Sequence, residues 1–280
     1  MKKWYAVIGD PISHSMSPFM HTKWLEELGL NASYIPIQVK KEQLAQAISS
    51  LKLLGASGWN VTIPHKEAII QHLDHLDESA KWMGAVNTVV VEKDGSLTGY
   101  NTDGTGFVQS LEESIGRDFK QSSILVIGAG GAARGISFAL KSHGYKDISC
   151  TNRTVDSARK LVNDINGTCA YSLDEAEAQL ANFQILIQTT PSGMKDSGIV
   201  LPLSLKSLKP SAIVTDIVYN PLLTPFLLEA KEKRVEIITG LGMFVHQGAL
   251  SFQKWTTHQP NTKRMIAELE QLLGGPNVNR

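Results

Sequence analysis

Short apolar runs alternate with amphipathic segments along most of this chain. Apolar runs of about four to eight residues between turn-forming residues are typical of buried strands, and apolar residues at helical spacing are typical of helices. The pattern predicts strands at 4–8, 34–39, 57–63, 86–91, 97–100, 123–127, 147–151, 183–188, 213–218 and 235–239. It predicts helices at 18–28, 43–54, 132–142, 157–164, 222–233, 243–255 and 262–273. The alternation of strand and helix predicts an α/β fold with parallel sheets.

Two features of the pattern predict how the chain divides into domains. Asp94-Gly95 between two strands is a strong hairpin signal, because a type I′ turn needs residues that accept positive φ. Past this hairpin, near Thr102–Thr105, the strand–helix series starts again. Gly240 and Gly242 flank a single leucine and are candidate hinges, beyond which the last helices can return to the first domain. We expect a discontinuous first domain, residues 1–104 and 241–280, and an inserted second domain, residues 105–240.

Composition narrows the possible partners. The 280 residues include 27 basic and 27 acidic side chains, and this balance gives no reason to expect nucleic acid. No apolar run reaches the roughly 18 residues of a membrane-spanning helix, so we expect no membrane partner. Two cysteines, Cys150 and Cys169, are too few for a disulfide framework and are typical of reduced thiols in a cytoplasmic protein. His72 and His75 lie in a polar stretch that we expect to be helical, and no third ligand is nearby, so we expect no metal.

A glycine-rich turn joins the predicted strand 123–127 to the helix that follows it. The turn consists of Gly128, Ala129, Gly130, Gly131, Ala132 and Ala133. Gly128 permits a tight turn, Gly130 lets the backbone approach a pyrophosphate, and Ala133 allows close packing of helix on strand. The start of the helix offers free N–H groups to phosphates. A tight turn without a ligand would look similar, but the strand–turn–helix–strand context favours a dinucleotide-binding, Rossmann-like domain.

The end of the next strand, 147–151, helps to choose the cofactor. NAD-binding proteins usually carry Asp or Glu there, bonded to the ribose 2′-hydroxyl. This chain has Asn152, Arg153 and Thr154 instead. A guanidinium can pair with a 2′-phosphate, which favours NADP. Asp156 lies close enough to oppose that phosphate, and a solvated surface arginine remains the alternative for Arg153.

Polar residues gather after three predicted strands of the first domain. Residues 9–18 include several hydroxyls that suit a polyhydroxylated ligand, although Ser17 before Pro18 is also a good helix cap. Lys66 follows a strand end, where α/β proteins bind ligands, although a single lysine is more often simply exposed. Asn87 and Asp103 flank the predicted hairpin, and turn chemistry would also explain them. Together, Lys66 and Asp103 would supply a proton donor and its charge partner.

Taken in order, these and further motifs resemble the shikimate dehydrogenase family along nearly the whole chain. The matching segments are Gly9–Pro18, Asn60–Lys66, Gly84–Thr88, Tyr100–Gly104, Gly128–Ala133, Asn152–Thr154, Thr190–Met194, Asp216–Pro221 and Gly240–Met243 with Gln247. The resemblance implies an N-terminal α/β substrate domain and a Rossmann-like NADP-binding domain. It also implies the NADP-dependent, reversible reduction of 3-dehydroshikimate to shikimate.

The resemblance further implies a role for individual residues. Lys66 and Asp103 are then the catalytic pair. The substrate is held at its carboxylate by Ser15, Ser17 and Tyr219, and at its ring hydroxyls by Thr62, Asn87 and Gln247. The phosphates and adenosine of NADP are held by Gly128, Ala129, Gly130, Gly131, Ala132, Asn152, Arg153 and Thr154. The nicotinamide half is flanked by Thr190, Met194, Ile217, Gly240 and Met243, with Tyr219 near the same end.

Some questions stay open at this point. In the family's usual NADP pattern a second arginine often stands four residues after Arg153, where this chain has Ser157. A quinate/shikimate dehydrogenase that uses NAD, and a homologue that binds shikimate without turnover, are the alternative functions. The partner is a small-molecule substrate in either case, and we expect a monomer or a homodimer.

Overall fold

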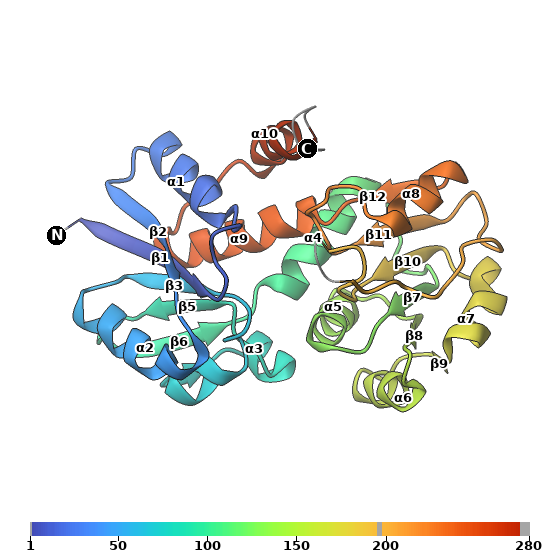
Figure 1. Ribbon diagram of the computed structural model, residues 1–280, viewed down its shortest axis with the longest axis horizontal. Coiled ribbons are helices and arrows are strands. Elements are labelled where there is room, and N and C mark those ends of the chain that lie inside the picture. Colours follow the sequence, from blue (N-terminus) through green and yellow to red (C-terminus); the bar gives the residue numbers. More distant parts are fainter. Residues whose placement is uncertain (1, 195–197, 275–280) are drawn as a thin grey trace. The chain divides into compact units, whose positions relative to one another are not determined.

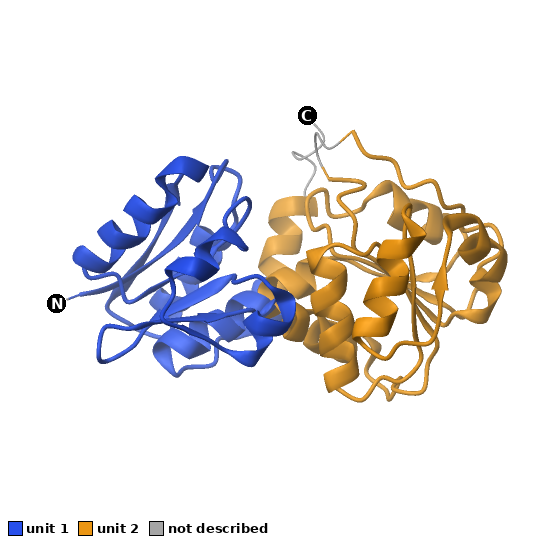
Figure 2. Cartoon of the chain, turned by 90° about the horizontal axis from the view of Figure 1, so that it is seen from below, with its two compact units in different colours: residues 1–103, 247–265 blue, residues 104–246, 266–280 orange. Residues whose placement is uncertain are grey.

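The computed structural model describes residues 2–194 and 198–274, so residues 1, 195–197 and 275–280 of the predicted domain ranges lie outside it. The chain divides into two compact units, and each is described separately (Figure 2). Unit 1 comprises residues 1–103 and 247–265, and unit 2 comprises residues 104–246 and 266–280. The predicted ranges cut the chain at nearly the same first position. The later boundaries differ from the predicted ones. Unit 2 extends to His246 and not to residue 240, and it also includes the final segment from Ile266, which was predicted to belong to the first domain.

Unit 1 is built on a mixed six-stranded sheet (Figure 1). Its strands are β1 (Lys3–Gly9), β2 (Ala32–Gln38), β3 (Gly58–Val61), β4 (His75–Leu76), β5 (Thr88–Val91) and β6 (Leu97–Tyr100). They lie in the order β2-β1-β3-β5-β6-β4. Strands β1, β2 and β3 are parallel, whereas β5 is antiparallel to both of its neighbours. The start of β5 therefore lies at the edge where β3 and β6 end.

Helices cover both faces of this sheet because successive side chains of a strand point to opposite faces. Helices α2 (Leu44–Leu53) and α3 (Glu78–Met83) pack with Ala6, Ile8 and Trp59 in one buried cluster. On the other face lie α1 (Ser17–Glu27) and the later part of α9 (Leu241–Thr256). There the ring of Tyr5 stacks on Trp255 at 5.0 Å between ring centres.

Unit 2 is built on a second six-stranded sheet, in which every pairing is parallel. Its strands are β7 (Ile124–Ile127), β8 (Ile148–Thr151), β9 (Ala170–Tyr171), β10 (Ile185–Gln188), β11 (Ile213–Asp216) and β12 (Glu236–Ile238). The spatial order is β12-β11-β10-β7-β8-β9. Numbered within the unit, this is the 3-2-1-4-5-6 order of a dinucleotide-binding sheet, whose switch point lies between its first and fourth strands. Those strands are β7 and β10.

The central strands of unit 2 are buried on both faces, and helices lie on each side. One cluster joins the sheet to α4 (Asp103–Ile115), α5 (Gly131–Ser142) and α6 (Val155–Asp164). The opposite cluster joins it to α7 (Leu173–Gln179) and α8 (Pro225–Glu232). The remaining elements are α10 (Thr262–Gly274) and the short helices η1 (Lys41–Gln43), η2 (Ala68–His72) and η3 (Leu180–Asn182). Both buried clusters agree with the predicted α/β fold.

The structure corrects three details of the predicted elements. Helix α4 was not predicted and begins directly at the expected junction. Of the hairpin residues only Gly95 has positive φ, and its N–H donates to the carbonyl of Glu92, which is a type I turn followed by a bulge rather than type I′. Likewise, His75 lies in a strand, not a helix.

The two glycines that were predicted as hinges are both sites of close packing. A Cβ on Gly242, inside α9, would lie 2.0 Å from the Oγ of Ser110. A Cβ on Gly240 would lie 2.4 Å from the carbonyl oxygen of Ile217. Neither glycine has positive φ. Their lack of a side chain therefore permits close approach.

No helix in the described part of the chain combines the length and the apolar character needed to span a bilayer.

Candidate active site

Polar segments that lie far apart in the sequence meet at one edge of the sheet of unit 1. Strands β1, β3 and β6 end at this edge, and the reversed strand β5 begins there. Lys66 follows β3, Asn87 precedes β5, and Asp103 follows β6 as the first residue of α4. Helix α9 adds Gln247 and Ser251 from the far end of the chain. The direction of β5 is what brings Asn87 to the same edge as the other two.

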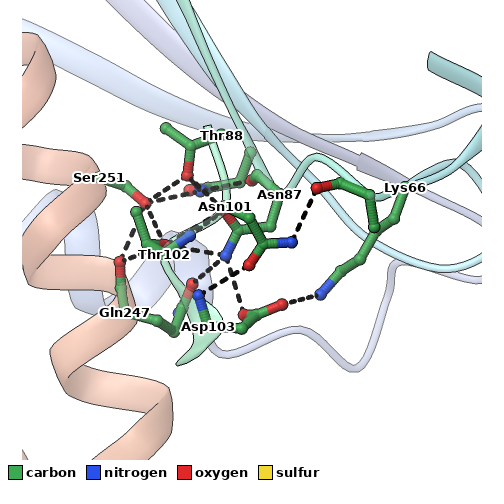
Figure 3. A network of polar contacts seen from close by, with 10 residues as sticks. Lys66, Asn87, Thr88, Asn101, Thr102, Asp103, Gln247 and Ser251 are labelled. Carbon is green, nitrogen blue, oxygen red and sulfur yellow. Dashed lines mark hydrogen bonds and ion pairs between the residues drawn. The ribbon is translucent and has the colours of Figure 1, made fainter. Parts of the chain in front are cut away.

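Lys66 and Asp103 form an ion pair in which Nζ lies 2.6 Å from Oδ2 (Figure 3). Their side chains are 31% and 15% exposed, so the pair is partly shielded but open to a ligand. Asp103 is held from a second side, because Asn87 Nδ2 donates to its Oδ1 at 2.8 Å. As the first residue of a helix, its carboxylate also lies at the positive end of the α4 dipole. The two residues that sequence reasoning paired are thus in direct contact.

The amide of Asn87 is oriented by neighbours on both of its ends (Figure 3). Its Oδ1 accepts from the backbone N–H of Thr102 at 2.9 Å and from the hydroxyl of Thr88 at 2.8 Å. This commits Nδ2 to the opposite side, where it reaches Asp103 and the Oε1 of Gln247, the latter at 3.3 Å. Asn87 and Gln247, both predicted to bind ring hydroxyls, therefore lie beside the ion pair.

The other predicted substrate residues divide between the two units. Ser15, Ser17 and Thr62 belong to unit 1, where the N–H of Ser17 donates to the Oγ of Ser15 at 3.3 Å. Thr62 lies against the end of β1, since a Cβ on Gly9 would be 2.4 Å from its methyl group. Tyr219 belongs to unit 2 and stacks on Phe244, with 4.4 Å between ring centres.

In unit 2 the glycine-rich turn lies at the end of β7, beside the switch point of the sheet. Gly128 has a φ of +113°, and a Cβ there would lie 2.6 Å from the Oγ1 of Thr189. A Cβ on Gly130 or Gly131 would meet nothing within 4 Å, so packing inside the protein does not require these glycines. Among the described residues no side chain caps the N-terminus of α5, whose first N–H groups also lack intrahelical partners. These features fit the pyrophosphate of a dinucleotide.

The end of β8 carries the residues predicted to select NADP. Asn152 Nδ2 donates to the carbonyl of Thr154 at 3.0 Å and so shapes the turn before α6. Arg153 is exposed and makes no ion pair with any described residue. Asp156, the acid that opposes a 2′-phosphate, instead pairs with Arg159 at 2.8 Å one turn along α6. The guanidinium of Arg153 is therefore available for a phosphate.

The residues predicted around the nicotinamide follow neighbouring strands of the same sheet edge. Thr190 follows β10 and lies next to Gly128, whose Cβ would be 3.0 Å from its methyl group. Ile217 follows β11 and touches Gly240, and both Ile217 and Met243 pack on one buried cluster. Met194 is 44% exposed. The structure thus gathers most of this set at one end of unit 2.

Sequence reasoning missed a buried carboxylate at this end. Asp216 is fully buried and accepts from the N–H of Val218 at 2.9 Å and from the hydroxyl of Thr224 at 2.7 Å. Gln188 donates to it at 3.4 Å and also to the carbonyls of Thr190 and Ser192. Burial raises the pKa of Asp216 from 3.8 to about 6, against the opposing effect of these hydrogen bonds. The sequence did contain a signal for this pair, because Gln188 and Asp216 are the polar last residues of strands that are otherwise largely apolar.

Two histidines and one cysteine near these residues are buried, and the Sγ of Cys150 donates to the carbonyl of Gly128 at 3.2 Å. His65 is buried with Nε2 2.6 Å from the carbonyl oxygen of Val39, and His21 is buried among aromatic rings. Burial raises the pKa of the Cys150 thiol to about 12. Within the described residues, no three His, Cys, Asp or Glu side chains come together as a metal site would require.

With this geometry described, comparison with known proteins identifies the family. Residues 7–89 match the model of the shikimate dehydrogenase substrate binding domain, and residues 110–200 match that of shikimate / quinate 5-dehydrogenase. Residues 240–270 match the shikimate 5′-dehydrogenase C-terminal domain. A shikimate dehydrogenase (NADP(+)) of Lysinibacillus sphaericus is 57% identical over 98% of this chain and 100% of its own length. The chain belongs to the shikimate dehydrogenase family.

Solved structures of this family have the same fold. A shikimate dehydrogenase in complex with NADP+ is 39% identical, with a TM-score of 0.88 over 97% of this chain and 96% of its own. The shikimate 5-dehydrogenase of Thermus thermophilus, in complex with NADP(H) and shikimate, is 34% identical. Its TM-score is 0.86 over 96% of this chain and 99% of its own. The predicted two-domain α/β fold with a Rossmann-like domain is confirmed.

Proposed function

We propose that this chain catalyses the reversible, NADP-dependent reduction of 3-dehydroshikimate to shikimate, a step of the shikimate pathway. The single observation that carries the proposal is the Lys66–Asp103 ion pair, held beside the amides of Asn87 and Gln247. A cation that can give up a proton, next to amides that can bind hydroxyls, suits the reduction of a carbonyl on a polyhydroxylated ring. The NADP-dependent relatives and their complexes with NADP and shikimate support the same substrate and cofactor.

NADPH, when held by the residues of unit 2, would supply the hydride that reduces the C3 carbonyl carbon of 3-dehydroshikimate. As the carbonyl π electrons move to oxygen, the Lys66 ammonium stabilises the growing charge and then donates its proton to that oxygen. Asp103 holds the ammonium and accepts a hydrogen bond from the neighbouring ring hydroxyl. Asn87 and Gln247 orient the ring, while Thr62, Ser15, Ser17 and Tyr219 complete substrate binding. In the reverse direction neutral Lys66 accepts the proton of the C3 hydroxyl.

The residues of unit 2 fit the cofactor. The open space at Gly130 and Gly131 and the uncapped start of α5 suit the pyrophosphate, so Gly128, Ala129 and Ala132 would line it too. Asn152, Arg153 and Thr154 would hold the 2′-phosphate and adenosine, with Arg153 as the charge partner. Thr190, Met194, Ile217, Gly240 and Met243 would surround the nicotinamide half. Unit 1 is then the substrate domain and unit 2 the NADP domain of a cytoplasmic monomer or homodimer.

An initial-rate comparison tests this function. Purified protein is assayed with shikimate or quinate, each with NADP+ or NAD+, by the absorbance of the reduced nicotinamide. We expect shikimate with NADP+ to give the highest kcat/KM of the four pairs, because Arg153 is free for a 2′-phosphate. A higher kcat/KM for quinate with NAD+ would establish the alternative dehydrogenase. Binding of shikimate in calorimetry without any absorbance change would establish a homologue without turnover, which the intact Lys66–Asp103 pair argues against.

A further inference from the structure

A line of buried polar side chains lies behind Asn87, away from Lys66. It consists of Tyr34 on β2, Asn60 on β3, Thr88 on β5 and Ser251 on α9, which are 5%, 7%, 0% and 0% exposed. The hydroxyl of Tyr34 donates to the Oδ1 of Asn60 at 2.7 Å. The Nδ2 of Asn60 then donates to the backbone carbonyl of Asn87 at 3.0 Å and reaches the hydroxyl of Ser251 at 3.1 Å. Two hydrogen bonds therefore connect the phenol to Asn87.

The hydrogen bonds of Asn60 fix the orientation of its amide. A backbone carbonyl can only accept, so Asn60 must turn Nδ2 toward Asn87 and leave Oδ1 on the other side. There, the Tyr34 hydroxyl is the one donor among the described residues that reaches Oδ1. Without that donor, Oδ1 would be a buried acceptor with no partner, and the amide would lose its preference for this orientation. The hydroxyl of Ser251 also depends on the orientation of the Asn60 amide, because its Oγ accepts a hydrogen bond from Asn60. The same Oγ lies 2.7 Å from the Oγ1 of Thr88.

The phenol is well suited to act as a fixed donor. Burial raises the pKa of Tyr34 well above its usual value of 10, so the hydroxyl stays protonated at any working pH. Its ring stacks on the buried imidazole of His21, with 4.3 Å between ring centres and 7° between planes. Its ring also lies near that of Trp255, with 6.2 Å between ring centres. Neighbours on three sides thus hold the ring and its oxygen in place.

We propose that Tyr34 is a positioning residue, whose hydroxyl orients the Asn60 amide and through it the substrate-binding Asn87. This inference rests on the proposed function, in which Asn87 binds the ring of shikimate. Thr88 links the same line to the side chain of Asn87, because its hydroxyl donates to Asn87 Oδ1. A disturbance at Tyr34 therefore reaches the substrate amide through both the backbone and the side chain of the β5 start.

Tyr34→Phe tests the proposal, with Tyr5→Phe as a matched control. Tyr5 lies directly opposite Tyr34 in the β1–β2 pairing, is 2% exposed and packs on the same Trp255 ring. Its hydroxyl donates to the carbonyl of Trp255 at 3.4 Å, whereas the hydrogen bonds of Asn60 go to Tyr34, Asn87, Thr88 and Ser251. Both variants delete one buried phenolic oxygen from the same face of one sheet. They differ in whether that oxygen belongs to the line behind Asn87.

We expect Tyr34→Phe to raise the KM for shikimate about 10-fold, the size of effect that one unsatisfied buried partner produces. The KM for NADP+ should stay within about twofold, because the cofactor residues belong to unit 2, and Tyr5→Phe should leave both KM values unchanged. A shikimate KM within about twofold of wild type, or equal changes in the two variants, would overturn the proposal. Absence of wild-type turnover would instead refute the proposed function itself.

A second measurement separates positioning from a general loss of structure. In an Asn60→Ala background, Tyr34→Phe should add almost no further increase in the shikimate KM, because the residue through which it acts is gone. If the two substitutions multiply their effects on KM, Tyr34 does not act through Asn60 and the proposal fails. The kcat of the same four proteins (wild type, the two single variants and the double variant) is measured as well. We expect each substitution to change kcat less than it changes the KM for shikimate.

Discussion

At the scale of single residues, Lys66 is the group on which the proposed chemistry depends most directly. Lys66→Ala removes the proposed proton donor but leaves Asp103 bonded to Asn87, and it does not alter the amides that are proposed to bind the ring. We predict a fall in kcat of about 100-fold or more, with a much smaller change in the KM for shikimate. Steady-state kinetics measure both values, and Lys93→Ala, an exposed lysine in the hairpin turn, is the control. A kcat within about threefold of wild type would refute the assignment.

Gly130 offers a second test at this scale, because packing within the protein does not require a glycine there. A methyl group there meets no atom within 4 Å, yet it would stand where the backbone approaches the pyrophosphate. We predict that Gly130→Ala raises the KM for NADP+ about 10-fold or more and changes the midpoint of thermal unfolding very little. Kinetics and calorimetry on the same preparation check this. An unaltered cofactor KM would mean that the phosphates bind elsewhere.

At the scale of elements, Asp216 and Gln188 connect the segments that follow β10 and β11. Gln188 bonds to Thr190 and Ser192, and Asp216 bonds to Val218 and Thr224. Thr224 in turn caps α8, because its Oγ1 accepts from the N–H of Leu227 at 3.3 Å. These segments carry most of the proposed nicotinamide contacts, so a fully buried network fixes their shape.

This network predicts a pH dependence of stability. Asp216 has a pKa of about 6 when folded and 3.8 as the reference, so the folded state is the one that holds its proton more tightly. Protonated Asp216 therefore adds at most about 3 kcal/mol to the free energy of unfolding. This contribution is fully present below about pH 4 and is lost as the pH rises through 6. Asp216→Asn removes this titration. The unfolding free energy of wild type minus that of the variant should fall between pH 4 and pH 7 in urea titrations, and a constant difference would contradict the prediction.

At the scale of the whole molecule, three helices cross from one unit to the other. The unit boundaries fall between residues 103 and 104 at the start of α4, between 246 and 247 within α9, and between 265 and 266 within α10. Each of these boundaries therefore falls inside a helix and not in a loop. Helix formation is cooperative, so loss of structure on one side is expected to spread to the other.

The tryptophans make this coupling measurable. All five, at positions 4, 24, 59, 82 and 255, belong to unit 1, whereas the proposed NADP site belongs to unit 2. We predict that urea unfolding followed by tryptophan fluorescence and by far-ultraviolet circular dichroism gives coincident transitions. NADP+ at about 100 times its Kd should move the fluorescence midpoint as well, by about 2.7 kcal/mol of stabilisation. A fluorescence midpoint that does not change when NADP+ is added would show that the two units unfold independently.

Much of the fold could be predicted because its strands and helices have strong local patterns. Each predicted strand from 123–127 onward overlaps a strand of the second sheet, since buried parallel strands are apolar on both faces. Helix α4 was overlooked because it starts at the residue where a domain junction was expected, although Phe107, Val108 and Leu111 have helical spacing. The turn type of the hairpin was wrong because Asp94-Gly95 suits more than one turn, and the strand register chooses between them.

The sequence by itself determined which chemistry this protein carries. Lys66, Asp103, the glycine-rich turn and Arg153 stand in local motifs, and the resemblance of these motifs to the shikimate dehydrogenase family implies their role. Tertiary structure alone decided which side chains meet. The reversed strand β5 brings Asn87 to the ion pair, α9 brings Ser251 from the far end of the chain, and β2 brings Tyr34 to Asn60. The physical reason is that a hydrogen bond depends on angles and on distances of about 3 Å, which long-range packing sets and local sequence pattern does not encode.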